Sequence, residues 1–176
     1  MTGPTTTRRT IVKGAAWTAP VLTAAAVAPA LAASPVDAPN LSTSQQGTGS
    51  GRRDATTLVI QPATLINTGG VAAEGVVITF ASSGPAITGF KLGAYGAELD
   101  PVAVGGSVSG LGTNNVTVTI PAGSMTVPAG GSTTSPATQI ITFANGDETT
   151  LTVTVTAANG GVPFVPPPTL VPVYAG

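Results

Sequence analysis

Two short runs in which an aliphatic residue alternates with threonine constrain the fold of this chain most strongly. They are Val116-Thr117-Val118-Thr119-Ile120 and Leu151-Thr152-Val153-Thr154-Val155. Successive side chains of a β-strand point to opposite faces, so each run places its apolar residues on one face and its threonines on the other. We therefore predict two half-buried strands with a hydroxyl-bearing solvent face. The expected core residues are Val116, Val118, Ile120, Leu151, Val153 and Val155, together with Val76, Ile78 and Phe80.

Five further segments are apolar or alternating and are separated by turn-forming residues. They span residues 57–67, 75–80, 87–95, 101–104 and 139–143. Glycine, asparagine, serine and proline fill the gaps, as in Asn67-Thr68-Gly69-Gly70 and Ser82-Ser83-Gly84-Pro85. About seven short strands without a helical period predict an all-β fold. We expect a single antiparallel immunoglobulin-like β-sandwich over residues 56–159.

The composition excludes several kinds of chemistry. Charged residues make up only 7% of the 176 residues, whereas a globular protein has roughly 25%. The chain contains no cysteine and no histidine, so it has no disulfide, thiolate metal site or cysteine nucleophile, and it lacks the usual general base near neutral pH. We therefore expect no cofactor.

Residues 1–33 resemble a twin-arginine signal peptide. Arg8 and Arg9 follow a threonine and are followed by apolar residues and Lys13. An uncharged, alanine-rich stretch comes next, and Ala30 and Ala32 fit the small-x-small pattern of signal peptidase sites. We expect residues 1–32 to be a signal peptide that is cleaved after Ala32, with the twin-arginine translocase and signal peptidase as partners during export. An uncleaved anchor is the alternative.

The chain that remains after cleavage is acidic and poor in charge. Three basic residues, Arg52, Arg53 and Lys91, stand against seven acidic ones, which gives a net charge of −4. Nucleic acid and anionic membranes are not expected partners of such a surface. No later segment offers an apolar stretch long enough to span a membrane, so we expect no stable membrane span.

Two segments outside the expected sandwich lack strand patterning. Residues 33–55 are rich in Gly, Ser and Pro and are predicted to be a flexible linker. Residues 160–176 are predicted to be a Pro-rich extended tail, because proline has no N–H for a central strand. No carboxy-terminal sorting motif follows residue 160, and no cysteine allows lipidation. We expect the mature protein to be secreted or loosely associated with the cell envelope.

One segment resembles a known class of domain. Asn67-Thr68-Gly69-Gly70-Val71-Ala72-Ala73-Glu74-Gly75-Val76-Val77-Ile78-Thr79 is similar to a part of CARDB-like and related immunoglobulin-like repeat domains, where N-x-G and small residues precede a Val-rich strand. Pro128-Ala129-Gly130-Gly131-Ser132 resembles a turn of the same domains. The resemblance covers residues 56–157 loosely. It implies an actinobacterial-type secreted spacer or binding module of the bacterial surface, without catalytic residues.

Lys91 is the only lysine outside the signal segment, and therefore the one lysine that could activate a serine nucleophile. Its neighbours Phe90 and Leu92 indicate a strand on which Lys91 faces solvent, and this is the interpretation that we favour. The alternatives are a Ser–Lys dyad and an intramolecular isopeptide bond to an asparagine, as occurs in some Gram-positive surface sandwiches.

Two carboxylate pairs, Glu98/Asp100 and Asp147/Glu148, lie in turn-like sequence. A glycosidase needs two carboxyl groups placed across a cleft, and few aromatic residues are present to hold a sugar beside them. Calcium takes about six to eight oxygen ligands, more than residues 145–148 supply, so we predict a hairpin turn there. No catalytic, cofactor-binding or metal-ligating residue is predicted.

The expected function is that of an exported, non-enzymatic structural or interaction protein of the bacterial cell envelope or extracellular space. The export motif, the single sandwich and the missing catalytic residue types point to it. The alternative is a secreted hydrolase or a carbohydrate-binding accessory domain.

Overall fold

Antiparallel strands make up almost all of the regular structure in the computed structural model, which describes residues 37–134 and 137–174. One short 3₁₀ helix, η1 (Pro101–Val104), accompanies them. The all-β prediction is confirmed. The strands are β1 (Gly51–Arg52), β2 (Thr57–Ile60), β3 (Thr64–Ile66), β4 (Ala73–Glu74), β5 (Val76–Ser82), β6 (Ile87–Ala94), β7 (Ala97–Leu99), β8 (Ser107–Ser109), β9 (Asn115–Ile120), β10 (Thr126–Val127), β11 (Ser132–Thr134), β12 (Gln139–Phe143), β13 (Thr149–Ala157) and β14 (Thr169–Val171).

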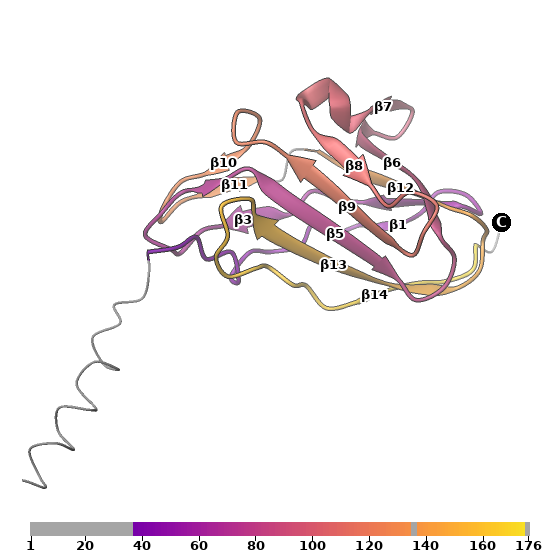
Figure 1. Cartoon of the computed structure of the whole chain (residues 1–176). Coiled ribbons are helices and arrows are strands. Elements are labelled where there is room, and N and C mark those ends of the chain that lie inside the picture. Colours follow the sequence, from indigo (N-terminus) through magenta and orange to yellow (C-terminus); the bar gives the residue numbers. More distant parts are fainter. Residues whose placement is uncertain (1–36, 135–136, 175–176) are drawn as a thin grey trace, which may run out of the picture. The chain divides into compact units, whose positions relative to one another are not determined.

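Two five-stranded sheets form the layers of a sandwich (Figure 1). The first sheet has the strand order β1-β2-β12-β6-β7, and the second has the order β14-β13-β5-β9-β8. Two smaller pairs, β10 with β4 and β11 with β3, lie at one end of the molecule. Along the chain, the five strands β5, β6, β9, β12 and β13 alternate strictly between the second and the first sheet, so the chain crosses from one layer to the other between each of them and the next.

The alternating runs form the centre of the second sheet. In β9 and β13 the aliphatic residues are buried and the threonines that alternate with them are half-buried, and β5 between them shows the same pattern. The register pairs Val153 with Phe80 and Phe80 with Val116, which keeps the apolar residues of three strands on one face. The core residues predicted from period-2 alternation are all buried, so this prediction is confirmed.

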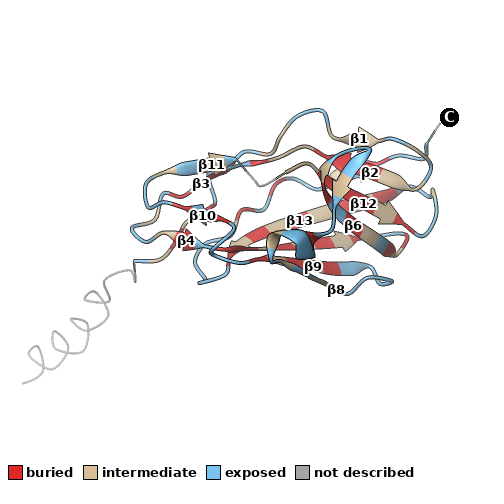
Figure 2. Ribbon diagram, turned by 90° about the horizontal axis from the view of Figure 1, so that it is seen from above, coloured by how far each residue is buried: buried red, intermediate tan, exposed pale blue. Residues whose placement is uncertain are grey.

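The buried faces of the two sheets share one hydrophobic core (Figure 2). Leu58, Phe90 and Ile141 of the first sheet belong to the same cluster as the apolar residues of the second. The rings of Phe80 and Phe90 meet between the layers with their centroids 5.4 Å apart. Each such buried side chain contributes roughly 1.5–3 kcal/mol of stability relative to an exposed one, so this layer supplies most of the driving force for folding.

The strand predicted over residues 57–67 is two strands. Residues 61–63 separate β2 in the first sheet from β3, which pairs with β11. Pro62 lies in this gap, and it has no N–H with which to continue a ladder. The expected number of about seven strands is not confirmed, because the molecule also contains several strands of two or three residues. The six strands of four residues or more, β2, β5, β6, β9, β12 and β13, all overlap predicted ranges.

The strand predicted over residues 101–104 is wrong, because these residues form η1. Asp100 caps the helix by accepting a hydrogen bond from Val102 N at 3.0 Å. Pro101 has a backbone torsion suited to the first helical turn, and Gly105 ends the turn in the left-handed region at φ 74°. The apolar pattern of Pro-Val-Ala-Val resembles a strand, but its flanking residues favour a turn.

The prediction of a flexible linker over residues 33–55 is wrong for residues 37–55, which pack against the sandwich. Leu41 is fully buried in the core, and β1 pairs with β2. Gln45 and Thr64 exchange two backbone hydrogen bonds of 2.8 Å. Backbone pairing of this kind does not depend on large side chains, so the polar composition of the segment concealed it.

The Pro-rich segment after residue 160 runs extended along the second sheet. Phe164 exchanges two backbone hydrogen bonds of 2.9 Å with Val155, and its side chain is buried. β14 then pairs with the start of β13 at the edge of the sheet. Prolines are tolerated at such an edge because it leaves one side of the strand unpaired.

Candidate functional site

The residues of the expected export signal are not part of the structural description. Arg8, Arg9, Lys13, Ala30 and Ala32 all lie outside the described residues. In the part of the chain that is described, no helix has the length and apolar character needed to span a membrane.

The carboxylates of Asp147 and Glu148 lie on a turn that joins the two sheets. The turn follows β12 of the first sheet and precedes β13 of the second, so the predicted hairpin is wrong: these two strands are not ladder partners. Asn145 Oδ1 accepts a hydrogen bond from Asp147 N at 3.1 Å, and Arg52 Nη2 donates to the Asp147 carbonyl at 2.6 Å. Over residues 37–134 and 137–174, no three Asp, Glu, His or Cys side chains group as a metal site.

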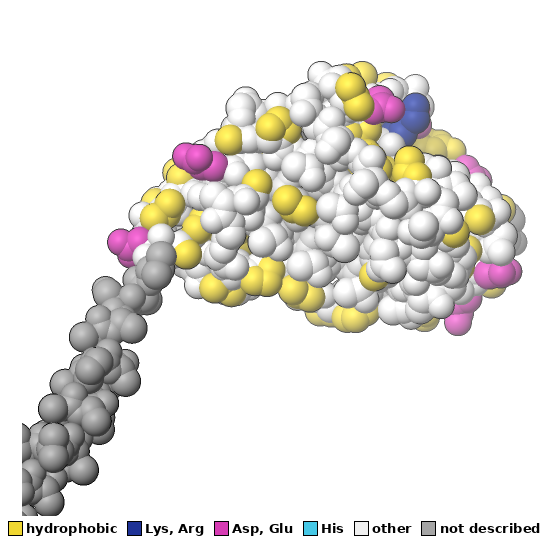
Figure 3. Space-filling view, viewed as in Figure 1, with side chains coloured by type: hydrophobic (Ala, Val, Ile, Leu, Met, Phe, Trp, Pro, Cys, Tyr) yellow, Lys and Arg dark blue, Asp and Glu magenta, His cyan; other side chains and the backbone are white. Residues whose placement is uncertain are grey.

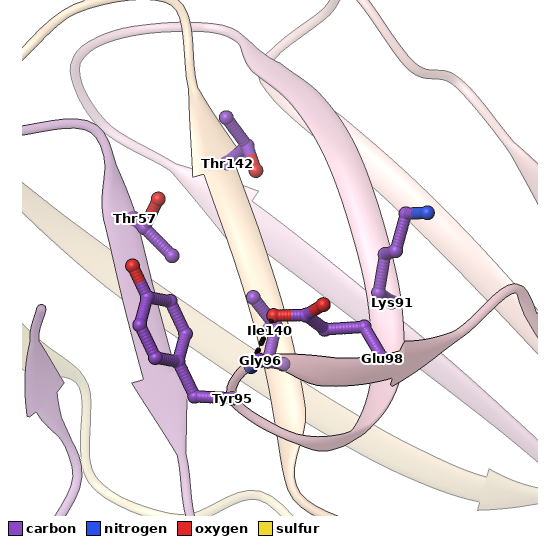
Figure 4. Close-up of a pocket in the computed structure, with 7 residues that line it drawn as sticks. All are labelled: Thr57, Lys91, Tyr95, Gly96, Glu98, Ile140 and Thr142. Carbon is purple, nitrogen blue, oxygen red and sulfur yellow. Dashed lines mark hydrogen bonds between the residues drawn. The ribbon is translucent and has the colours of Figure 1, made fainter. Parts of the chain in front are cut away.

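The other carboxylate pair is divided between two roles. Asp100 caps η1, as described above, while Glu98 projects from β7 into a pocket on the outer face of the first sheet. This pocket, here called the Tyr95 pocket, has a volume of about 400 Å³ and opens to solvent (Figure 4). It is lined by Thr57, Lys91, Tyr95, Gly96, Glu98, Ile140 and Thr142.

A tight hairpin brings the aromatic and the acidic side chain to the pocket. Leu92 pairs with Leu99 and Ala94 pairs with Ala97, so that only Tyr95 and Gly96 remain for the turn between β6 and β7. Gly96 has φ +90°, which a residue with a side chain rarely adopts. The turn therefore depends on glycine, and it places Tyr95 and Glu98 on opposite sides of the pocket floor (Figure 4).

Tyr95 is held by a carboxylate from a distant part of the chain. The residue is 52% exposed, and its Oη donates to Asp54 Oδ2 at 3.2 Å. Asp54 Oδ1 also accepts hydrogen bonds from Thr56 N at 2.9 Å and from Thr57 N at 2.7 Å. Burial raises the pKa of Asp54, but the hydrogen bonds from Thr56, Thr57 and Tyr95 outweigh it, so the net pKa is lowered. The bond to Asp54 is the main cause that raises the pKa of Tyr95.

Glu98 is fixed as an ionised acceptor. Its Oε1 accepts a hydrogen bond from Gly96 N at 2.7 Å. This bond is the main cause that lowers the pKa of Glu98, and the charge of Lys91 adds to the effect. The carboxylate extends across Ile140 towards Tyr95 (Figure 4).

The floor of the pocket is Ile140, which is only 4% exposed and yet lies outside the main core cluster. Its neighbour Ile141 faces the core, so Ile140 must point to the outer face of the sheet. Its ladder partner Val59 is buried on the same outer face. This floor was not predicted from the sequence, although two adjacent isoleucines in one strand indicate that both faces of the strand are covered.

Lys91 lies on β6 with its side chain exposed, as predicted. No serine lines the Tyr95 pocket in the described structure, so the pocket does not contain the Ser–Lys dyad considered above. An exposed position on the outer face also separates Lys91 from the core, where a protected isopeptide bond would form.

The opposite surface of the molecule carries hydroxyl groups in place of charges. Thr154, Thr79 and Thr117 lie in one row across β13, β5 and β9, and Ser109 of β8 continues that row. We call this outer face of the second sheet the threonine face. Figure 3 shows it as largely white, with acidic and basic side chains only at its margins. Hydroxyl groups keep this face hydrated where the chain has few charges.

Comparisons with known proteins give this site no precedent. No family model matches the chain, and no significant match was found among curated proteins or solved structures.

Proposed function

We propose that the chain is an exported, non-enzymatic interaction or structural protein of the bacterial cell envelope or extracellular space, and that it binds its partner through the Tyr95 pocket. One observation carries the proposal: Tyr95 and Glu98 are each held by a hydrogen bond while they line an open pocket. Groups that are already fixed lose little freedom on binding, which favours recognition. The twin-arginine motif at Arg8 and Arg9, and the resemblance to CARDB-like surface domains, support the location.

A secreted hydrolase is the competing function. A carboxylic acid that donates a proton near neutral pH needs a raised pKa, whereas the pKa of Glu98 is lowered. Lys91 also lines the pocket, but no serine does, so a Ser–Lys dyad is not formed there. The pocket is therefore better suited to holding a ligand than to cleaving one.

The binding role can be tested with the full chain and washed cell walls of the bacterium that produces it. The fraction that sediments with the walls should fall strongly for Tyr95→Ala. It should stay unchanged for Thr152→Ala, the matched control on the threonine face. If all three proteins sediment alike, or if none does, the pocket is not the binding surface and the proposal fails.

Export and the absence of catalysis need separate measurements. Replacing both Arg8 and Arg9 with lysine should leave the precursor inside the cell, since the translocase recognises the arginine pair. The purified protein should not turn over a panel of glycan, peptide and ester substrates. Turnover that is lost in Lys91→Ala or Glu98→Gln would identify a hydrolase instead.

A further inference from the structure

We propose that the Tyr95 pocket binds a neutral saccharide unit. This inference rests on the proposed interaction function and names the chemical class of its ligand. The pocket combines an aromatic ring and the apolar floor of Ile140 with hydroxyl and charged groups around the rim. A sugar ring has the same two-sided character, because its C–H faces are apolar and its edge carries hydroxyl groups. The chemistry of the pocket therefore matches a sugar ring better than a purely apolar molecule or an ion.

The Tyr95 ring can serve as the platform on which the sugar lies. Its hydroxyl is tied to Asp54 and its turn is fixed by Gly96, while about half of its surface faces solvent. Tyrosine offers a large, rigid and amphipathic contact surface at a low cost in conformational entropy. Because the ring is already oriented, stacking a sugar face on it requires little further ordering.

Glu98 and Lys91 can divide the recognition of the sugar hydroxyls. The ionised carboxylate of Glu98 only accepts hydrogen bonds, and the ammonium group of Lys91 only donates them. A sugar hydroxyl does both, so it can pair with either group. The side chain of Lys91 points away from the Glu98 carboxylate, so the two groups can contact different parts of one ligand (Figure 4).

The two opposite charges also favour a neutral ligand. A charged ligand that contacts both groups is attracted by one and repelled by the other, whereas a neutral ligand can accept a hydrogen bond from Lys91 and donate one to Glu98 without any like-charge contact. The volume of about 400 Å³ is in the lower part of the range for small-molecule sites. The open side of the pocket leaves room for a saccharide chain to continue beyond the bound unit.

Calorimetry of the full chain with short oligosaccharides tests the inference. The probes are neutral oligomers of glucose, mannose and N-acetylglucosamine, with oligomers of galacturonic acid and of glucosamine as charged comparators. At least one neutral probe should bind, with a Kd of roughly millimolar because one ring is present, and the charged probes should bind more weakly. Tyr95→Ala should weaken binding about tenfold or more, and Tyr95→Phe should retain most of it. Thr152→Ala should have no effect.

Two results would overturn the inference: binding of none of the neutral probes, or binding that Tyr95→Ala leaves intact. Either can occur while the sedimentation with cell walls still depends on Tyr95. In that case the interaction function stands and only the saccharide is wrong. Thermal unfolding of each variant guards against misfolding, because Tyr95 lies on an exposed turn and its replacement should leave the midpoint nearly unchanged.

Discussion

Asp54 and Tyr95 stabilise each other in opposite protonation states at the rim of the pocket. The carboxylate is ionised because hydrogen bonds outweigh the effect of burial on its pKa. The phenol stays protonated because it donates to that carboxylate. At neutral pH the pair therefore holds the ring in one orientation, which links a loop near residue 54 to the β6–β7 turn.

Replacing Tyr95 with phenylalanine should raise the pKa of Asp54 towards its ordinary value of about 3.9, because one hydrogen bond to the ionised form is lost. NMR titration of the Asp54 carboxyl carbon would measure the change, with Thr152→Ala as the control. Since the folded-state pKa is depressed, the contribution of Asp54 to stability is present above the unfolded pKa and is lost as pH falls through the folded value. If the Asp54 pKa is the same in Tyr95→Phe, the hydrogen bond from Tyr95 does not stabilise the ionised carboxylate.

Asn67 illustrates what the sequence could not reveal about a single residue. The sequence places it in a predicted turn, and in the structure it lies directly after β3, in the loop that leads to β4. The side chain is fully buried, however: Oδ1 accepts from Asn40 N and Gly69 N, and Nδ2 donates to the carbonyls of Val71 and Val127. Its partners are up to 60 residues away in sequence, so no local pattern could identify them.

At the scale of the element, strand β9 separates its two faces sharply. Val118 is fully buried between the sheets, while its neighbour Thr117 lies half-buried on the threonine face. Val118→Asp should unfold the domain, because an unpaired buried carboxylate costs several kcal/mol and a domain of this size is stable by only about 5–15 kcal/mol. Thr117→Asp should cost about 1 kcal/mol.

Chemical denaturation of the two variants, followed by circular dichroism, would check the difference. Both substitutions introduce the same residue into the same strand, so the intrinsic strand propensity of aspartate cancels between them. Equal destabilisation would mean that the inner and outer faces of β9 are not distinguished as the structure indicates.

The accuracy of the strand predictions followed the strength of the alternation. β5, β9 and β13 are buried on one face and half-hydrated on the other, so their period is visible in the sequence. Residues 101–104 have no such period, and the capping residues Asp100 and Gly105 favour the 3₁₀ helix η1 over a strand. The Tyr95 pocket was not predicted, because it depends on which strands lie side by side in the first sheet, and strand order is not encoded in any single segment.

At the scale of the whole molecule, the core extends beyond the predicted sandwich of residues 56–159. Leu41 comes from the expected linker, and Phe164 and Val171 come from the expected tail, yet all three belong to the core cluster. The two segments also meet: Leu41 N donates to the Val162 carbonyl at 2.9 Å. The folding unit is therefore longer than the segment with visible strand patterning, and the described residues from Asp37 onward belong to one compact unit.

A chain that begins at residue 56 should accordingly be much less stable than one that begins at residue 37. The shorter chain lacks Leu41 and β1, and it leaves the core and the edge of β2 uncovered. Within the longer chain, Leu41→Ala should cost about 2–5 kcal/mol, the usual range for a buried leucine. Leu170→Ala is the matched control, because Leu170 is 61% exposed on β14 and its truncation should cost about 0.5 kcal/mol or less. Thermal unfolding would measure all four proteins. Equal stability of the two chains, together with a negligible effect of Leu41→Ala, would show that residues 37–55 do not stabilise the core and act as a flexible linker.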